Sequence, residues 1–198
     1  MKTTQKKLLI TSFEPFGGET VNASEMAVYS LPDMIGNWEL CRLTVPVVFG
    51  RAADLAAEYA GSIRADAILC VGQAAGRSEV TPEMIAVNLR YAKIPDNDGQ
   101  KPLDEPVVSG GREAYFSTMP ARRMADAVRA HGLPASLSYS AGAYVCNDIF
   151  YSLLRRFDGT GVRVGFIHVP VTPAQGSPSL ETSVTAEALA YAIEAIEP

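Results

Sequence analysis

The sequence has few of the residues that build disulfide frameworks and metal centres. Its 198 residues include three cysteines and two histidines, and none of them stands at CxxC or Cys/His zinc-site spacing. Three thiols cannot all pair with one another, and so low a content does not suit a small disulfide-stapled fold. We therefore predict reduced cysteines and no metal site.

Long hydrophobic runs and an excess of positive charge are also absent. No apolar stretch is long enough to cross a bilayer, and the first residues, MKTTQKKLLITSF, show no cleavable signal pattern. The 17 Lys and Arg against 22 Asp and Glu give a formal net charge of −5. This charge argues against a general affinity for nucleic acid or anionic membranes. We expect a cytoplasmic protein whose partners include neither a membrane nor a nucleic acid.

What the sequence does contain is the composition of an ordinary globular protein. Apolar residues make up 47% and charged residues 20% of the chain, which are typical values. A chain of this length can bury roughly 70% of the surface that it exposes when unfolded. Because no repeat, linker or low-complexity tract interrupts it, we predict a single domain over residues 1–198.

Strand-like and helix-like segments alternate along the chain. Strand patterns are expected at 6–13, 37–47, 65–72, 83–92, 135–141 and 162–170. Helical patterns are expected at 23–31, 50–63, 120–132, 145–157 and 180–197. This order implies right-handed crossovers and a mostly parallel, twisted sheet with helices on both faces. We therefore predict an α/β fold, a three-layer α/β/α sandwich.

Ligands bind such sheets at the loops beyond the carboxyl ends of the strands. Segments 13–22, 72–83 and 168–178 follow expected strands at that edge. The connection 92–112 is unusually long for a compact domain, and long connections are often functional. These four segments are the candidate site loops.

Only one pairing of a cysteine with a histidine has both members at that edge. Cys41 and Cys70 lie inside strand patterns, where a small buried residue is expected, and His131 suits a cap in the last turn of a helix. Cys146 instead begins a helix, and His168 closes a buried strand. From position alone, packing remains an equally good interpretation of both.

A cysteine in the first turn of a helix can also serve as a nucleophile. The helix N-terminus lowers a thiol's pKa, and its free N–H groups can receive an oxyanion. We therefore predict a stabilised thiolate at Cys146. The glycine in the preceding SAGAY permits an unusual backbone path into this helix.

A thiol–imidazole pair usually needs a third polar group that orients the ring. Glu83 is a candidate because strand alternation places it on the more apolar face of 83–92. A buried carboxylate needs a partner, which the pair would supply. A glutamate at a strand end that reaches solvent is the simpler interpretation of the pattern alone.

Several motifs resemble those of pyrrolidone-carboxylate peptidases, also called pyroglutamyl peptidases I. The two longest are GQAAGRSEVTPEMIAVN and SLSYSAGAYVCN. TSFEPFGG, IPDNDGQKPLDEP, AYFSTMP and GFIHVP extend the resemblance, in the same order, over almost the whole chain. Members of this family are cytosolic cysteine peptidases that remove an N-terminal pyroglutamyl residue from peptides.

The resemblance implies a role for each candidate. Cys146 corresponds to the nucleophile, His168 to its general base and Glu83 to the acidic member of the triad. The implied substrate-binding residues are Phe13 and Phe16, flanking the flat ring, and Asn22, Gln73, Lys93 and the backbone around Val145. The resemblance further implies a thioester intermediate, no metal or organic cofactor, and a homotetramer.

Two departures from the family's usual sequence leave other functions open. Met84 stands where relatives commonly have a basic residue, and Lys93 stands where they have an arginine. Lysine keeps the charge but lacks the planar, two-pronged donor of arginine. One alternative is a weakly active member that binds N-blocked or lactam ligands. Another is a different α/β thiol amidohydrolase, such as a glutamine-hydrolysing enzyme.

Overall fold

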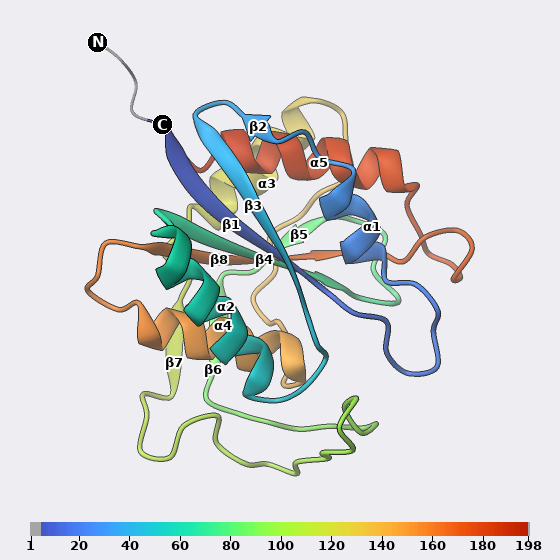
Figure 1. The fold of residues 1–198 in the computed structure, drawn as a ribbon. Coiled ribbons are helices and arrows are strands. Elements are labelled where there is room, and N and C mark those ends of the chain that lie inside the picture. Colours follow the sequence, from blue (N-terminus) through green and yellow to red (C-terminus); the bar gives the residue numbers. More distant parts are fainter. Residues whose placement is uncertain (1–4, 198) are drawn as a thin grey trace.

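A six-stranded sheet forms the centre of the computed structural model, which describes residues 5–197 (Figure 1). Its strand order is β2-β3-β1-β4-β8-β5. The four inner strands are mutually parallel: β1 (Lys6–Phe13), β3 (Trp38–Val45), β4 (Ala67–Gln73) and β8 (Arg163–Val169). The short edge strands are antiparallel to their neighbours: β2 (Met34–Ile35) and β5 (Thr81–Pro82).

Helices cover both faces of this sheet (Figure 1). One layer consists of α1 (Ala23–Tyr29), α3 (Ala121–Ala130) and α5 (Thr182–Glu194). The other consists of α2 (Arg51–Ile63) and α4 (Val145–Arg156). The predicted three-layer α/β/α fold with a mostly parallel sheet is confirmed.

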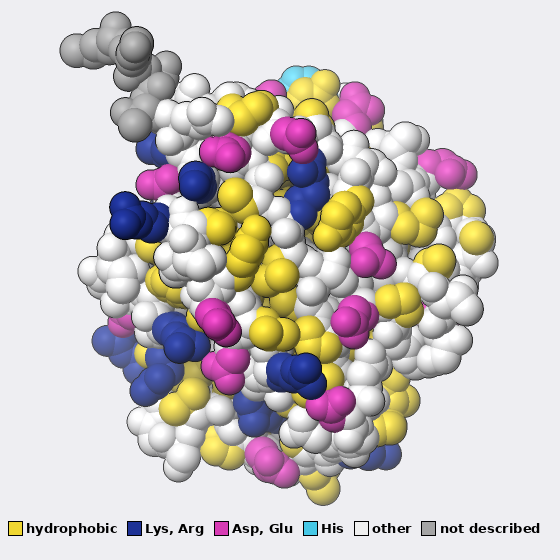
Figure 2. Space-filling model, viewed as in Figure 1, with side chains coloured by type: hydrophobic (Ala, Val, Ile, Leu, Met, Phe, Trp, Pro, Cys, Tyr) yellow, Lys and Arg dark blue, Asp and Glu magenta, His cyan; other side chains and the backbone are white. Residues whose placement is uncertain are grey.

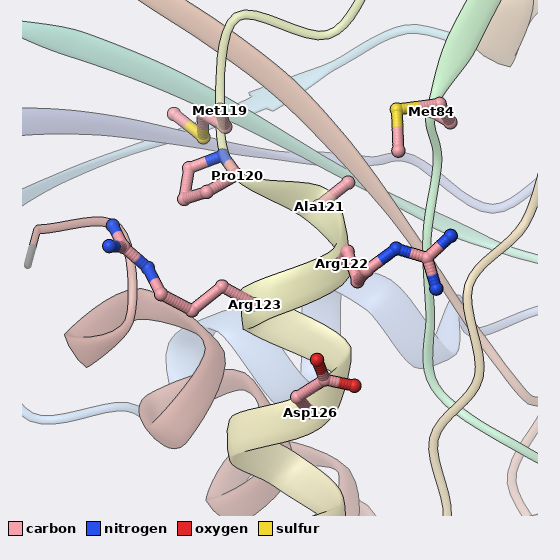
Figure 3. A pocket seen from close by; sticks show the side chains of 7 residues that line it. All are labelled: Met84, Met119, Pro120, Ala121, Arg122, Arg123 and Asp126. Atoms are coloured by element: carbon pink, nitrogen blue, oxygen red, sulfur yellow. The ribbon is translucent and has the colours of Figure 1, made fainter.

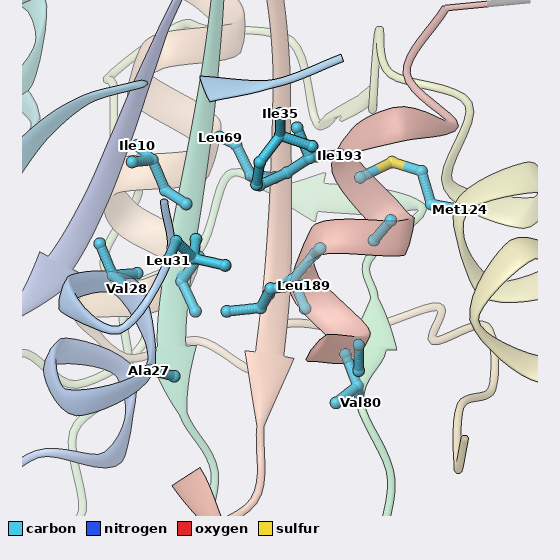
Figure 4. Packing of buried hydrophobic residues seen from close by; sticks show 14 of the residues in the cluster. Ile10, Ala27, Val28, Leu31, Ile35, Leu69, Val80, Met124, Leu189 and Ile193 are labelled. Atoms are coloured by element: carbon cyan, nitrogen blue, oxygen red, sulfur yellow. The ribbon is translucent and has the colours of Figure 1, made fainter. Parts of the chain in front are cut away.

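Two hydrophobic clusters hold the layers together, because successive strand residues point to opposite faces of the sheet. On β1, Leu8 and Ile10 pack toward α1 and α5, whereas Leu9 packs toward α2 and α4. Figure 4 shows Ile10 in the first cluster with Leu189 and other side chains of α5. β4 contributes to both clusters, which explains its uninterrupted apolar sequence.

Two of the expected strands differ in the structure. Within 83–92, only β6 (Ile85–Val87) is regular, and it pairs with β7 (Ala114–Phe116) in a separate two-stranded sheet. The prediction of a strand at 135–141 is wrong, since this segment forms only isolated bridges to residues 80 and 83.

Pro82 explains the interrupted pairing of 135–141. The N–H of Val80 donates to the carbonyl of Pro134, and the N–H of Met84 donates to that of Ser138. A regular parallel ladder needs a donor midway between these two, at position 82. Proline has no N–H, so the segment follows the sheet edge without becoming a strand.

The carboxyl ends of the parallel strands meet at one edge of the sheet. Phe13 ends β1, Gln73 ends β4, and His168 is the next-to-last residue of β8. The chain order reverses beside β1, which has β3 on one side and β4 on the other. This is the position at which open α/β sheets bind ligands.

The surface shows no continuous charge of one sign on the face drawn in Figure 2. Acidic and basic side chains are scattered there among apolar and uncharged ones. Between residues 5 and 197, no helix has the length and apolar character needed to cross a membrane.

Candidate active site

The structure brings Glu83 and His168 into direct contact. β5 pairs with β8 so that Thr81 lies opposite His168, and the chain then carries Glu83 beside the imidazole. Both side chains are buried, and His168 Nδ1 lies 2.8 Å from Glu83 Oε1. Because a carboxylate only accepts hydrogen bonds, Nδ1 carries the proton, and Nε2 keeps a free lone pair.

The two pKa shifts describe a neutral imidazole beside an ionised carboxylate. Burial alone would raise the pKa of Glu83, but the hydrogen bond and electrostatic interaction with His168, together with the nearby Ser138 hydroxyl and the Arg77 guanidinium, hold it below its usual range. Burial lowers the pKa of His168, and the attraction of Glu83 only partly opposes this effect. At neutral pH His168 can therefore accept a proton at Nε2.

Cys146 lies against the sheet next to this pair. A Cβ atom added to Gly72 would come within 2.9 Å of Cys146 Sγ and 2.8 Å of the Phe166 ring. Gly72 is also the cross-strand partner of His168, and neighbouring strands are about 4.8 Å apart. The missing side chain at Gly72 thus lets the sulfur settle beside the strand position of His168.

The helix that carries Cys146 is fixed at its start by two buried polar side chains. Asn147 accepts a hydrogen bond from the N–H of Val87 at 2.9 Å and donates to the carbonyls of Val87 and Leu89. Asp148 accepts from Arg90 Nε at 2.5 Å and from the N–H of Gly50 at 2.7 Å. Because both residues directly follow the cysteine, these bonds fix its position.

The first turn of this helix places free backbone N–H groups beside the thiol. Gly142 has a φ of +78°, a conformation that favours glycine and turns the chain into the helix. Val145 is the first helical residue and Cys146 the second. N–H groups in a first turn have no acceptor within the helix, so they are available to an oxyanion formed at the thiol.

The predicted stabilised thiolate is wrong for the protein without substrate. Cys146 as a whole is half-buried, but the packing around its sulfur raises the pKa of the thiol to about 12, and the negative charge of Glu83 adds to this effect. Arg77 and the backbone N–H of Cys146 oppose the rise without reversing it. The thiol therefore holds its proton at neutral pH and needs a base to remove it.

An apolar cavity of about 290 Å³ opens beside the turn that precedes Cys146. Its lining residues are Phe16, Tyr91, Lys93, Ile94, Ala143 and Tyr144. The Tyr144 ring lies 6.3 Å from that of Phe16 and meets Phe49 edge-on at 5.3 Å. Of the predicted substrate-binding residues, the structure places Phe16 and Lys93 at this cavity.

The other four predicted substrate-binding residues do not line the cavity. Phe13 and Val145 are buried in the hydrophobic cluster beneath α2 and α4. Asn22 caps α1: its Oδ1 accepts from the N–H of Ser24, and its Nδ2 donates to a loop carbonyl. Gln73 Oε1 accepts from the N–H of Ala23 at 2.8 Å and from Gln175 at 2.9 Å.

Asn22 and Gln73 thus hold the site loops to one another. The bonds of Asn22 join α1 to the loop that contains Phe16, because the acceptor of its Nδ2 is the carbonyl of Glu14. Gln73 joins the end of β4 to the segment after β8. Asn22 therefore has a structural role in the site loops, since its side-chain nitrogen and oxygen both bind within the chain.

Comparisons with known proteins agree with this geometry. A model of the pyroglutamyl peptidase family matches residues 6–197. The chain belongs to this family. It is 44% identical to the pyrrolidone-carboxylate peptidase of Enterococcus faecalis, covering 96% of this chain and 92% of the relative. It is also 44% identical to the Levilactobacillus brevis enzyme of that name, over 96% and 97% of the two chains.

Solved structures of the family have the same fold. Pyroglutamyl peptidase I from Bacillus amyloliquefaciens superposes with a TM-score of 0.93 at 39% identity, over 97% of this chain and 95% of that one. Pyrrolidone carboxyl peptidase from Thermococcus litoralis gives 0.91 at 36% identity, over 96% and 93%. Cys146, His168 and Glu83 therefore lie at the ligand edge of a pyroglutamyl peptidase fold.

One of the two departures from the family sequence points away from the site. Met84 lines a depression of about 450 Å³ with Met119, Pro120, Ala121, Arg122, Arg123 and Asp126 (Figure 3). In Figure 3 the sulfur of Met84 faces Ala121 at the start of α3. Because Cys146 and His168 are not among the residues of this depression, Met84 removes no group from their surroundings.

Sequence reasoning missed two residues of this site. Arg77 Nη1 donates to Glu83 Oε1 at 2.7 Å, and Tyr144 forms one wall of the cavity. The requirement that a buried carboxylate have a cationic partner could have pointed to Arg77, six residues before Glu83. Among residues 5–197, no group of three or more His, Cys, Asp or Glu side chains could hold a metal ion.

Proposed function

We propose that this protein is a cysteine peptidase that removes the N-terminal pyroglutamyl residue from peptides. Cys146 is the nucleophile, His168 its general base and Glu83 the residue that orients the imidazole. The observation that supports these roles best is the buried 2.8 Å hydrogen bond from His168 to Glu83, beside the cysteine at the ligand edge of a pyroglutamyl peptidase fold.

The reaction begins with transfer of the thiol proton. Since burial keeps the Cys146 thiol protonated and His168 neutral, Nε2 accepts the proton as the sulfur attacks the pyroglutamyl carbonyl. Glu83 stabilises the imidazolium that forms. The oxyanion of the tetrahedral intermediate is received by N–H groups in the first turn of α4.

The second half of the reaction returns the enzyme to its starting state. The imidazolium donates its proton to the nitrogen of the leaving amine as the C–N bond breaks, which leaves a thioester on Cys146. Water then loses a proton to His168 and attacks the thioester. Pyroglutamate leaves, and the thiol regains its proton.

The cavity suits the substrate class. Pyroglutamate carries no charged α-amine, because its nitrogen is part of a lactam, so its pocket needs apolar walls and a few polar groups. Phe16 and Tyr144 provide flat aromatic surfaces for the ring. Lys93, which stands where relatives commonly have an arginine, also lines the cavity. It is exposed and places a positive charge at the opening of the cavity.

Hydrolysis of a pyroglutamyl chromogenic amide tests the proposal. The protein should release the reporter, and Cys146→Ala should reduce the release to background because no other thiol can take the place of the nucleophile. Cys41→Ala is the matched control, since Cys41 lies on β3, whose neighbours are β1 and β2. A folded, reduced protein that releases no reporter would contradict the proposal.

Two other outcomes of this assay would favour the alternatives. Tight binding of 2-pyrrolidone without turnover would indicate a weakly active member, for which Lys93 at the cavity is the motivating observation. Hydrolysis of free glutamine, with none of pyroglutamyl peptides, would indicate a thiol amidohydrolase.

We further propose that the protein acts in the cytoplasm as a homotetramer. Its membership of the pyroglutamyl peptidase family supports this, since the family is cytosolic and forms tetramers. Light scattering should give about four times the chain mass of 21.2 kDa. A mass equal to one chain at micromolar concentration would refute the tetramer, and recovery of the protein from a membrane or secreted fraction would refute the location.

A further inference from the structure

Arg77 touches the chain at three points around the proposed catalytic residues. Its Nη1 donates to Glu83 Oε1 at 2.7 Å and also to the hydroxyl of Thr81. Its Nη2 donates to the carbonyl of Ser140 at 3.3 Å. The Thr81 hydroxyl in turn donates to the backbone carbonyl of His168 at 3.3 Å.

These contacts reach the segments of all three proposed catalytic residues. Glu83 is contacted directly and His168 through one hydroxyl, while Ser140 belongs to the turn that leads into Cys146. A single guanidinium thus connects the loop after β4, the end of β8 and the approach to α4.

The carboxylate of Glu83 depends on this arginine. Its Oε1 accepts both from His168 Nδ1 and from Arg77 Nη1, whereas no hydrogen-bond partner is found for the buried Oε2 within residues 5–197. Without Arg77, the fully buried carboxylate would lose its cationic partner, because the imidazole of His168 is neutral. A buried carboxylate that loses a cationic partner is strongly destabilised.

We propose that Arg77 is a positioning residue of this site: its guanidinium holds the Glu83 carboxylate against His168 and joins both to the turn before Cys146. It does not line the substrate cavity, so it acts through Glu83 and not through the substrate. The catalytic consequence rests on the proposed function, whereas the consequence for the Glu83–His168 pair does not.

The positive charge of Arg77 has its own effect on His168. Two charged groups act on the imidazole, Glu83 after β5 and Arg77 in the loop after β4, and Cys146 of α4 packs against Gly72, the cross-strand partner of His168. Glu83 raises the pKa of His168, and Arg77 lowers it. Loss of the charge should therefore raise that pKa, and the acid limb of kcat/KM should move to higher pH.

Two variants separate position from charge. Arg77→Met removes both, so kcat should fall by up to about 100-fold, the cost of misplacing a reacting group by about 1 Å, while KM changes little. Arg77→Lys keeps the charge without the planar fork, so kcat should fall while the acid limb stays at the wild-type pH. Arg112→Met is the matched control, since exposed Arg112 pairs with exposed Asp158.

Proton NMR titration provides a readout that needs no turnover. The chain has two histidines, so the signal of His168 can be assigned by comparison with a variant that lacks His131. In Arg77→Met the His168 midpoint should move to higher pH. If Arg77→Met unfolds, Arg77→Lys carries the test through kcat.

The outcomes distinguish the two proposals. Full activity and an unchanged His168 midpoint in folded Arg77→Met, or wild-type kcat in Arg77→Lys, would overturn the role of Arg77. A wild-type protein with no peptidase activity, but with the predicted shift of His168, would overturn the proposed function and leave the positioning of the pair intact.

Discussion

Replacement of Gly72 by alanine tests the placement of Cys146 most directly. The added Cβ would meet Cys146 Sγ at 2.9 Å and the ring of Phe166 at 2.8 Å. Ordinary van der Waals contacts begin near 3.4 Å. Both neighbours must therefore give way, the sulfur by about 0.5 Å and the ring of the buried Phe166 by about 0.6 Å.

The cost of this displacement can be estimated in two ways. Overpacking of a well-packed core by one methyl group destabilises a protein by about 1–3 kcal/mol. A misplacement of about 1 Å in a reacting group costs on the order of 100-fold in rate. A shift of half that size in Sγ should therefore lower kcat by roughly 10-fold, and KM should change little because Gly72 does not line the cavity.

Steady-state hydrolysis of a pyroglutamyl amide and urea unfolding measure the two effects. Gly61→Ala is the matched control, because no atom lies within 4 Å of a Cβ at this position in α2. It should stabilise the protein by about 0.5–1 kcal/mol without changing kcat. Wild-type kcat and stability in Gly72→Ala would show that Cys146 does not rest against the sheet at this position.

Two further substitutions test the roles of Glu83 and Asn22. Glu83→Gln should lower kcat by roughly 10²–10⁴-fold. Because the carboxylate raises the pKa of His168, the substitution should also move the acid limb of the pH–rate profile to lower pH. A shift of that limb to higher pH would contradict the prediction. Asn22→Ala removes the cap of α1, so the free energy of unfolding in urea should fall by about 1 kcal/mol while KM stays unchanged. A large rise in KM would instead show that Asn22 contacts the substrate.

The sequence was sufficient to predict the strands whose apolar runs lie inside the central sheet. The predicted segment 6–13 coincides with β1, and the run at 65–72 coincides closely with β4, which is buried on both faces. At 135–141 the alternation is present, but the missing N–H of Pro82 interrupts the ladder. That proline lies on another segment, which the local pattern could not identify as the neighbour.

The residues of the site also include some that the sequence pattern could predict and some that it could not. Position in the topology was enough to place Cys146 and His168 together at the ligand edge, because the ends of strands and the starts of helices can be read from the pattern. The family motifs were needed to favour a catalytic role over packing. The pKa of the thiol was predicted in the wrong direction, since it depends on how deeply the sulfur packs over Gly72. Arg77 was missed because its loop shows neither strand nor helix periodicity.

The two departures from the family sequence now have different consequences. Met84 faces the start of α3, outside the residues around Cys146 and His168 (Figure 3). Lys93 lines the cavity beside the helix that carries Cys146, and it has a compact ammonium in place of the planar guanidinium expected from the family sequence. A difference in activity from relatives should therefore be sought at Lys93. Lys93→Arg should change kcat/KM for pyroglutamyl amides, and replacement of Met84 by lysine should leave it unchanged.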